Sequence, residues 1–587
     1  MEPRRVPIVL RLGAGVALVA ALPVLAAFLP PELLPPGYLW LVALGDFAVS
    51  SPNLYGLAAL LAFVAVIVAA RALQALWFNQ VRARLSGTHA KAERYDFPFK
   101  QVDLLAEVRR VLSSKRLKES YFIGIEPAKR LFGRKKRHYL TEEQLTMHVD
   151  CIGQTGSGKT ASCLLPLIFQ FALRGKGLVF FDRKGSAENL NAVRNMAAVA
   201  GRTSDLRVFS LPFPDDSHSY NPLWLAPRTD TSKGGDPLAV AERAFSIFKQ
   251  DMQEAYYKNL GESLFRSLIR VLHGMADNGA SLPFAFTDVL ECLQNREGLL
   301  YCLGHTEDRL SAKNIHAQMQ NLGEKFGPSL MGLQNMTQKY ADIGLINVPE
   351  PDVMLEEALE KNLIVYFQLP ANYYGTISED IGKIALQDLV QASSRRQIHR
   401  ASTNQLPFGV FIDEFADFAF TGMISALNKL RDANIQFFLA HQSIGDLERV
   451  SKEFATGVSD NTRTKLTLFQ NNPALCEQIA KSIGTYQTFK TTSRQSVGAL
   501  AVRLDMGEQS LREVEEFRLH PNRIKSLAPR GQAYLVEPAR HVALNLGCLP
   551  KAFFTKPPTE PLVPPRRGGR GLFLRDRLAA AVPGVVA

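Results

Sequence analysis

The chain has 587 residues, 46% of them hydrophobic and 21% charged, which is typical of a protein that folds around hydrophobic cores, with roughly two to four domains at this length. Its 68 lysines and arginines exceed its 56 acidic residues, and the net charge of +12 favours nucleic acid or anionic lipid as a partner, although a merely solvated basic surface fits equally well. The six cysteines form no C-x-x-C pair and the histidines form no H-E-x-x-H motif, which disfavours a disulfide framework and a zinc site. We therefore expect most of the protein to lie in the reducing cytosol.

Two apolar runs near the N-terminus have the length that a bilayer core requires. Residues 12–29 and 54–70 contain about 18 and about 17 residues without a charge. Arginines and lysines flank the pair on its outer sides, whereas the connecting residues 30–53 contain neither, and the positive-inside rule then predicts a transmembrane hairpin with both ends in the cytoplasm. A cleaved signal peptide for the first run and buried core helices for both runs are the alternatives, and the charge distribution argues against them.

Composition and periodicity divide the rest of the chain. The segment "RRVLSSKRLKES" and its surroundings are basic, which fits contact with anionic lipid or DNA beside the membrane, or an ordinary solvated surface. Apolar residues at three- and four-residue spacing predict a helical insert, and a tail rich in Pro, Gly and Arg is expected to be flexible. The expected parts are the hairpin (1–80), a basic juxtamembrane segment (81–145), a nucleotide-binding domain in two pieces (146–234 and 346–550), an all-α insert (235–345) and the tail (551–587).

The segment "CIGQTGSGKT" carries a phosphate-binding loop. A strand-like stretch precedes the loop, a helix-like stretch follows it, and the strand-like "GLVFFDRKG" completes the start of a doubly wound α/β domain. Glycines let such a loop curl so that its N–H groups point at phosphate oxygens, Lys159 would reach the β- and γ-phosphates, and the Thr160 hydroxyl would bind Mg²⁺. The expected nucleotide contacts are Gly153, Gln154, Thr155, Gly156, Ser157, Gly158, Lys159 and Thr160.

The segment "FGVFIDEFADF" supplies two carboxylates directly after an apolar strand. Asp413 is expected to hold the Mg²⁺ shell, and Glu414 is expected to orient or activate the attacking water. A glutamate directly after the aspartate points to ATP hydrolysis rather than to a GTPase switch or a small-molecule kinase. The alternative is that the pair only caps the strand and begins a helix.

Two polar residues follow in "SALNKLRDANIQFFLAHQS". Gln442 comes just after the strand-like residues 435–440, where it could sense the γ-phosphate, although such glutamines are also ordinary turn formers. Arg431 lies near the end of a helical stretch, where an arginine is usually a solvated charge or a partner of the helix dipole.

The order of these features resembles the type IV coupling proteins, the VirD/TraG/TraD-type ATPases of conjugation and type IV secretion. A membrane hairpin, a phosphate-binding loop, a strand ending in "DRKGS", a helical insert, "FIDEF" and "LAHQS" succeed one another up to about residue 545. "SGKT" and "DE" are generic to P-loop ATPases, whereas the order, the hairpin and the insert are specific. The resemblance implies an α/β, RecA-like P-loop ATPase domain with an all-α insert, preceded by a two-helix transmembrane hairpin.

The resemblance also implies roles for single residues. Family members are hexameric, and an arginine of one subunit completes the neighbour's site. Arg431 occupies the similar position, and Gln442 resembles the sensor glutamine, so the expected catalytic residues are Lys159, Glu414, Arg431 and Gln442, with Thr160 and Asp413 as Mg²⁺ ligands.

Other matches to the family leave the role of the residue open. Asp182 and Lys184 match a strand-end Asp and Lys, with Arg183 in place of the usual proline, and either a functional or a strand-capping role fits them. Arg463 and Lys465 fall in a polar turn before a strand, where DNA contact and an ordinary surface turn are both open.

From the resemblance we expect a homo-hexameric, ATP- and Mg²⁺-dependent ATPase of the bacterial inner membrane, multi-pass, with both termini cytoplasmic. It would recruit and help translocate DNA, effector proteins or both through a type IV secretion or conjugation system. The expected partners are DNA, bound with little sequence preference, relaxase or relaxosome proteins, effector proteins and channel components. The alternatives are a chromosome-segregation-type DNA translocase, which usually has more spans and a winged-helix tail, and a membrane-anchored cargo receptor with little motor activity.

Overall fold

The structure is a computed structural model that describes residues 100–127, 135–225, 236–248, 255–277, 280–398, 405–420, 422–497, 503–537, 540–559, 562–565 and 571–581. The two predicted membrane-spanning runs, 12–29 and 54–70, lie outside these residues. Within the described ranges no helix combines the length and the apolar character needed to cross a bilayer. The chain divides into two compact units, and the smaller one contains residues 485–516 of the described part.

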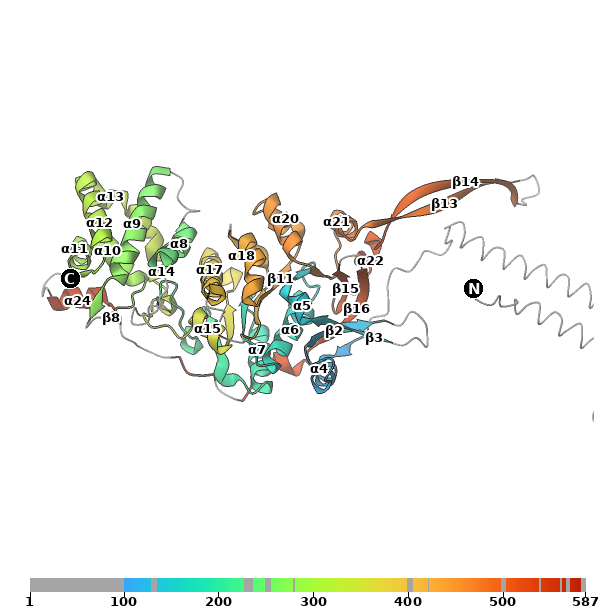
Figure 1. The fold of residues 1–587 in the computed structure, drawn as a ribbon, viewed down its shortest axis with the longest axis horizontal. Coiled ribbons are helices and arrows are strands. Elements are labelled where there is room, and N and C mark those ends of the chain that lie inside the picture. Colours follow the sequence, from blue (N-terminus) through green and yellow to red (C-terminus); the bar gives the residue numbers. More distant parts are fainter. Residues whose placement is uncertain are drawn as a thin grey trace, which may run out of the picture. The chain divides into compact units, whose positions relative to one another are not determined.

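A mixed sheet of twelve strands organises the larger unit (Figure 1). Its parallel half has the order β12 (Thr464–Thr467), β4 (Val149–Ile152), β11 (Ile435–His441), β10 (Phe408–Ile412), β5 (Leu178–Asp182), β9 (Ile364–Gln368) and β6 (Leu206–Ser210). Parallel strands end at one common edge of a sheet, so the residues that follow β4, β5, β10 and β11 are gathered there. These are the phosphate-binding loop, the "DRKG" turn, the acidic pair and Gln442.

The other half of the sheet is antiparallel. It continues from β12 through β15 (Gln532–Glu537), β16 (Arg540–Cys548) and β2 (Ser120–Glu126) to β3 (Lys136–Thr141), and the short β1 (Val102–Asp103) pairs with β16. The sequence placed residues 81–145 outside the nucleotide-binding domain, and this placement is wrong for β1, β2 and β3. Their buried side chains, such as Tyr121 and Leu140, continue the core of the sheet, and the abundance of charge around them hid the strand pattern.

Alternate residues of the central strands enter two cores, one on each face of the sheet. In β5, Val179 and Phe181 belong to one core, while Leu178 and Phe180 belong to the other. This is the pattern expected of parallel strands that are covered on both faces. Helices α4 (Leu104–Ser113), α6 (Leu165–Leu173) and α7 (Ala187–Val199) cover one face, and α17 (Thr376–Ile398), α18 (Met423–Lys429) and α20 (Lys452–Asn461) cover the other.

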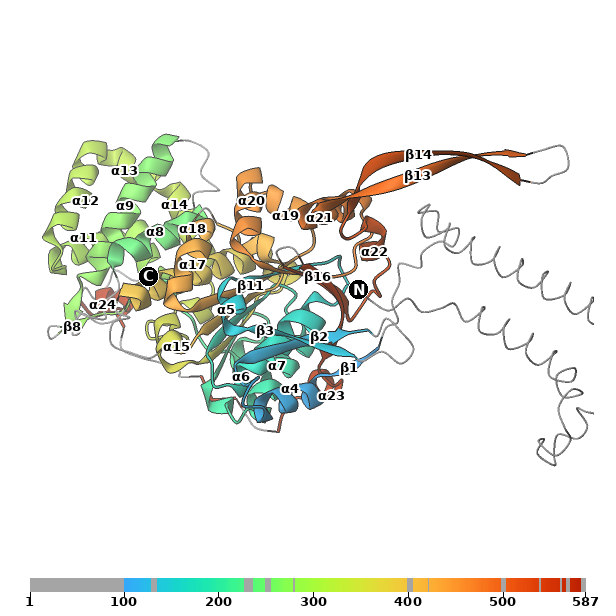
Figure 2. The ribbon, with the colours of Figure 1, turned by 45° about the vertical axis from the view of Figure 1, so that its right-hand side comes forward.

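A helical region interrupts the sheet between β6 and β9 (Figure 2). Its main helices are α8 (Pro237–Phe248), α9 (Ala255–His273), α10 (Phe286–Gln294), α11 (Arg296–His305), α12 (Arg309–Leu322) and α14 (Met331–Ala341). A two-residue pair of strands, β7 (Ala276–Asp277) and β8 (Ala280–Ser281), is the exception to its helical character. The apolar stripes of these helices merge with one face of the sheet into a single core.

The described part of the C-terminal tail is packed rather than flexible, in contrast to the prediction from its composition. Helix α23 (Ala552–Thr555) contacts α7, and α24 (Leu574–Ala581) contacts α10 and α11 of the helical region. Leu572 and Leu574 are fully buried there, and the Leu574 N–H donates to Asp288 Oδ1 at 2.8 Å. Leu572 and Leu574 therefore fix residues 571–581, which follow the Pro-, Gly- and Arg-rich run in the sequence.

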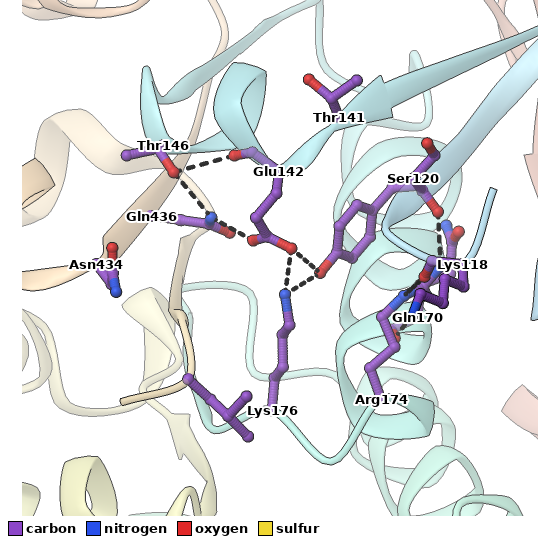
Figure 3. Close-up of polar contacts among 12 residues, drawn as sticks. Lys118, Ser120, Thr141, Glu142, Thr146, Gln170, Arg174, Lys176, Asn434 and Gln436 are labelled. Atoms are coloured by element: carbon purple, nitrogen blue, oxygen red, sulfur yellow. Dashed lines mark hydrogen bonds and ion pairs between the residues drawn. The ribbon is translucent and has the colours of Figure 1, made fainter. Parts of the chain in front are cut away.

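A buried ionic cluster joins the antiparallel edge to the parallel strands (Figure 3). Glu142 begins α5 (Glu142–Thr146), forms an ion pair with Lys176, and accepts hydrogen bonds from Tyr121 Oη at 3.1 Å and Gln436 Nε2 at 2.6 Å. Lys176 Nζ also donates to Tyr121 Oη at 2.6 Å. Burial lowers the pKa of Lys176, and Glu142 opposes that effect. Because Gln436 is on β11, the cluster fixes the start of the strand whose other end carries Gln442.

The smaller unit contains a long two-stranded ribbon, β13 (Thr485–Val497) and β14 (Arg503–Phe517). Within it Tyr486 Oη donates to Glu516 at 3.1 Å, which links the two strands near their base. We predicted no strand in this stretch from the sequence, since its alternation of polar and apolar residues is weak.

Candidate nucleotide-binding site

The phosphate-binding loop leaves β4 and enters a wide, π-helical turn, Lys159–Leu164, that leads into α6. Gly156 and Gly158 have φ angles of 79° and 87°, a left-handed conformation that residues with a side chain rarely adopt. At Gly153 a Cβ atom would lie 2.5 Å from Ser157 Oγ and 2.9 Å from Leu468 Cβ. The three glycines are therefore required by the curl and the close packing of the loop.

The loop is anchored to the residue run that follows β12. The Gln154 N–H donates to the Phe469 carbonyl at 3.1 Å, and Gln154 Oε1 accepts from the Asn471 N–H at 3.2 Å. Ser157 Oγ is buried and has no hydrogen-bond partner among the described protein atoms. The loop thus has a fixed frame, and its backbone N–H groups lie at the common edge of the sheet.

Lys159 lies inside this curl. Its side chain is 3% exposed, and Nζ donates to the Gly153 carbonyl at 2.7 Å. Burial lowers the pKa of Lys159, and the charges of Glu414 and Asp413 oppose that effect. The ammonium is therefore held at the loop, beside the carboxylates of the acidic pair.

The structure brings Thr160 and Asp413 together, although 253 positions separate them in the sequence. Thr160 Oγ1 donates to Asp413 Oδ2 at 2.6 Å, and both side chains are buried. Strand β11 lies between β4 and β10, so Asp413, at the end of β10, reaches the first turn of the helix across one intervening strand.

Glu414 and Gln442 complete the same cluster. Glu414 has φ 53° and ψ 54°, a left-handed conformation that is costly for a residue with a Cβ atom. Gln442 Nε2 donates to Glu414 Oε2 at 3.1 Å, while Gln442 Oε1 accepts from Thr155 Oγ1 at 2.7 Å. Gln442 therefore links the Glu414 carboxylate to the phosphate-binding loop.

The "DRKG" turn after β5 contributes one structural and one site-facing residue. Asp182 is fully buried and accepts hydrogen bonds from Tyr366 Oη at 2.7 Å, Asn189 Nδ2 at 2.9 Å and the Lys184 N–H at 3.0 Å, so its carboxylate holds the turn. Lys184 Nζ instead lies 3.1 Å from Asp413 Oδ2. The sequence left the roles of Asp182 and Lys184 open. Their contacts show that Asp182 stabilises the turn, whereas Lys184 points toward the site.

A pocket of about 420 Å³ opens beside the acidic pair. Its lining includes the charged residues Arg183, Lys184, Glu414 and Arg449 and the amide of Gln442. Arg183 is buried and pairs with Asp417 at 2.9 Å, and Arg449 is exposed and pairs with Asp446 at 2.7 Å.

Arg431 is not part of this cluster. It precedes β11, whereas Gln442 follows that strand, and seven strand residues correspond to roughly 20 Å. Its guanidinium donates to the Asn428 carbonyl at 3.2 Å and to Met147 Sδ at 3.3 Å, and it lines a second cavity of about 420 Å³ with Arg463 and Lys465. Arg431 thus lies at the sheet edge opposite the loop of its own chain.

Comparisons with known proteins find relatives among the type IV coupling proteins. Residues 407–529 match a family model described as the TraM recognition site of TraD and TraG. The Type 4 coupling protein DotL of Legionella pneumophila subsp. pneumophila is 21% identical over 392 residues, which cover 57% of this chain and 48% of DotL, so the chain spans about half the length of that curated relative. The chain is related to the type IV coupling proteins.

Solved structures of the coupling protein TrwB show the same fold. The structure of TrwB in complex with the non-hydrolysable ATP analogue ADPNP aligns to this chain with a TM-score of 0.52 and 15% sequence identity, and the alignment covers 81% of this chain and 100% of the TrwB chain. TrwB in complex with ADP and Mg²⁺ has a TM-score of 0.50, 15% identity and coverages of 79% and 97%. The prediction of an α/β P-loop ATPase fold with a helical region is confirmed, and the predicted membrane hairpin stays a prediction.

Two features of this site were not recognised in the sequence. His441, just before Gln442, is 1% exposed, and its two ring nitrogens face Asp150 Oδ1 at 2.8 Å and the Ser443 carbonyl at 2.9 Å. Both of these oxygens can accept a hydrogen bond, so the surroundings favour the doubly protonated ring. Burial lowers the pKa of His441, but Asp150 outweighs that effect and the net pKa is raised. The position of His441 directly before Gln442 was the only sequence signal, because Asp150 comes from another strand.

The second feature is Arg530, in the turn before β15. A Cβ atom on Gly158 would lie 3.8 Å from Arg530 Cα and Cβ, so this turn packs against the phosphate-binding loop. Buried Gln532 holds the turn by accepting from the Ala528 N–H at 2.7 Å. Strands β12 and β15 lie on the side of β4 opposite to β11 and β10, so Arg530 approaches the loop from the side away from Glu414.

The oxygen donors at the loop fit Mg²⁺. The Thr160 hydroxyl and the Asp413 carboxylate are hard ligands that already converge, and Mg²⁺ usually takes one or two protein ligands together with phosphate oxygens and waters. Among the described residues no group of three or more His, Cys, Asp or Glu side chains could hold a metal alone. A dedicated all-protein metal cage is therefore not what this part of the chain provides.

Proposed function

We propose that this coupling-protein relative is an ATP hydrolase that works as a homo-hexamer anchored in the bacterial inner membrane. The observation that supports it best is the convergence of Thr160, Asp413, Glu414 and Gln442 on one phosphate-binding loop. In this arrangement the loop N–H groups and Lys159 bind the phosphates, and Thr160 and Asp413 hold Mg²⁺. The metal supplies charge that offsets the negative charge on the β- and γ-phosphates.

The remaining residues act on the water and on the developing charge. Glu414 orients the attacking water and takes up its proton, while Gln442 fixes the Glu414 carboxylate relative to the loop. Lys159 stabilises charge on the γ-phosphate from within the subunit. Arg431 cannot reach its own loop along β11, and we infer that it enters the site of a neighbouring subunit, where an added cation stabilises the transition state.

Loss of turnover in two variants tests the hydrolysis. Lys159→Ala removes the phosphate-binding ammonium, and Glu414→Gln removes the carboxylate with little change of shape. Both variants should keep the fold, checked by thermal unfolding, and should lose ATPase activity by about 10²- to 10⁴-fold, as expected for a lost general base or charge clamp. Wild-type-like turnover in either variant would refute the assignment.

Mixed rings test the position of Arg431. Arg431→Ala subunits keep an intact loop, and Lys159→Ala subunits keep an intact Arg431. Each variant alone should be inactive, whereas a mixture should regain part of the activity, because some interfaces then combine an intact loop with an intact arginine. Mixtures that stay inactive, although the subunits assemble together, would show that Arg431 does not act across the interface.

We further propose that hydrolysis moves DNA, protein cargo or both toward a type IV secretion or conjugation channel. The net charge of +12 and the cavity lined by Arg463 and Lys465 are consistent with sequence-tolerant contact to DNA phosphates. DNA should raise the ATPase rate, and its binding should weaken steeply with salt. If the rate is the same with and without DNA, a cargo receptor with little motor activity becomes the better description.

The docking partner proposed for residues 407–529 is a relaxosome protein of the TraM type, since the matching family model is described by TraM recognition. Binding of purified TraM-type protein to the full chain, with a chain lacking residues 485–516 as the comparison, would test it. The membrane anchor is proposed to be the hairpin of residues 12–29 and 54–70. Deletion of residues 1–80 should release the protein from the inner-membrane fraction.

A further inference from the structure

Lys184 occupies a position that the proposed mechanism has not used. Its Nζ lies 3.1 Å from Asp413 Oδ2, 3.1 Å from Thr160 Oγ1 and 3.9 Å from Glu414 Oε1. The first two oxygens are those assigned above to Mg²⁺, and the third belongs to the residue that orients the water. One ammonium group therefore lies among all three functional oxygens.

The charge balance explains why an ammonium is there. The Asp413 side chain is 0% exposed, and a buried carboxylate without a counter-charge is strongly unfavourable. Lys159, the other nearby cation, is bound to the Gly153 carbonyl, and in the described part of the chain the ion pair of Asp413 is with Lys184. The Lys184 ammonium, 3.1 Å from Asp413 Oδ2, therefore supplies the counter-charge that this carboxylate requires.

The backbone of Lys184 is fixed while its side chain can move. Its N–H is bound to Asp182, whose carboxylate is itself held by Tyr366 and Asn189. The side chain is 43% exposed and borders the pocket of about 420 Å³ beside Glu414 and Gln442. A lysine has four rotatable bonds, so rotation of the stem can carry its ammonium from Asp413 into this pocket.

We propose that Lys184 is a built-in counter-ion that occupies the metal-binding oxygens of Thr160 and Asp413 until Mg²⁺–ATP binds, and that it then turns into the adjoining pocket to pair with the γ-phosphate. The proposal rests on the proposed function, because it takes Thr160 and Asp413 as the Mg²⁺ ligands. Two consequences follow: a divalent ion without nucleotide competes with a resident cation and binds weakly, and Lys184 favours ATP over ADP.

Mn²⁺ alone is the probe for the first consequence, since carboxylate and hydroxyl oxygens suit it as they suit Mg²⁺ and its binding is read directly by electron paramagnetic resonance. The full chain in detergent is titrated without nucleotide. Lys184→Met should bind one Mn²⁺ about tenfold more tightly than wild type, and the double variant Lys184→Met/Asp413→Asn should lose this gain. Lys184→Arg keeps the charge and should behave as wild type.

Arg449→Met is the matched control. Arg449 lines the same pocket, but its ion pair is with Asp446, so its removal changes the local charge without freeing Asp413. This variant should bind Mn²⁺ as wild type does. Equal Mn²⁺ affinity in Lys184→Met and wild type, or an equal gain in Arg449→Met, overturns the counter-ion role.

Nucleotide affinity tests the second consequence. In the presence of Mg²⁺, Lys184→Met should bind a non-hydrolysable ATP analogue about tenfold more weakly and ADP with unchanged affinity, since ADP has no γ-phosphate. An equal loss for both nucleotides would mean that Lys184 only supports the fold. Failure of the wild type to bind any Mg²⁺–nucleotide would refute the proposed function itself, and normal wild-type binding with unchanged variant curves would refute the Lys184 proposal alone.

Discussion

The left-handed backbone of Glu414 predicts an unusual order of stability among substitutions at that position. In most conformations glycine is less stable than alanine by about 0.5–1 kcal/mol, because glycine loses more chain entropy on folding. At φ 53° and ψ 54° the Cβ atom costs roughly 1–2 kcal/mol, and glycine does not bear this cost. Both variants lose the same hydrogen bond from Gln442, so that loss cancels in the comparison. Glu414→Gly should therefore be more stable than Glu414→Ala by about 1 kcal/mol.

Differential scanning fluorimetry and an ATPase assay measure the two sides of this prediction. With an unfolding entropy of about 2.1 cal/mol/K per residue, a difference of 1 kcal/mol corresponds to about 1 °C in the melting temperature of a chain of this size, within reach of replicate scans. Both variants should lose turnover. Ala200→Gly is the control, because Ala200 has φ −79° and should show the usual order. If Glu414→Ala melts at or above Glu414→Gly, the surrounding fold does not impose the left-handed conformation.

The other predictions concern three contacts away from the acidic pair. The pKa of His441 is raised in the folded state, so its ion pair with Asp150 contributes fully to stability below the unfolded-state pKa near 6.5. This contribution is lost as the pH rises through the folded-state pKa. The difference in melting temperature between wild type and His441→Gln should therefore shrink with rising pH. Glu142→Ala should lower the free energy of unfolding by about 3 kcal/mol, because it leaves the Lys176 ammonium buried without its carboxylate partner. The double variant Glu142→Ala/Lys176→Met should recover much of this stability, as measured by thermal unfolding. Arg530→Gln should weaken the binding of ATP and of ADP about equally, by about tenfold, because the turn that carries Arg530 packs against the phosphate-binding loop on the side away from Glu414. Fluorescent-nucleotide titration measures both affinities, and unchanged binding or a loss for ATP alone would contradict this prediction.

The parts of the site that sequence predicts are those written in continuous motifs. The phosphate-binding loop, the Asp413–Glu414 pair and the placement of Gln442 after a strand each depend on a short segment, and the residue types within that segment are sufficient to predict its chemistry. The contact of Lys184 with Asp413, the Asp150–His441 pair and the approach of Arg530 depend instead on which strands are neighbours. Strand order is set by packing over the whole sheet, and a single sequence carries little information about it.

The same limit applies to the fold. Apolar periodicity predicted the helical region and the central strands, because each of these elements buries one face or both. The antiparallel strands β2 and β3 were missed since β3 begins with charged residues and the segments around both strands are basic, and the ribbon of β13 and β14 was missed since few of its residues alternate clearly. Composition gave no indication of the packed helix at residues 571–581, which is held by the buried side chains of Leu572, Leu574 and Leu578.

The packing of α24 against the helical region makes that region a folding unit assembled from two distant lengths of chain. Residues 236–345 expressed alone would expose the apolar sites that Leu572, Leu574 and Leu578 fill, and should aggregate or melt early. A chain that ends at residue 565 keeps the sheet face that this region packs on, and residues 571–581 added to it as a separate peptide should raise its melting temperature. In a domain dissection of this protein, the last helix therefore belongs with the middle of the sequence.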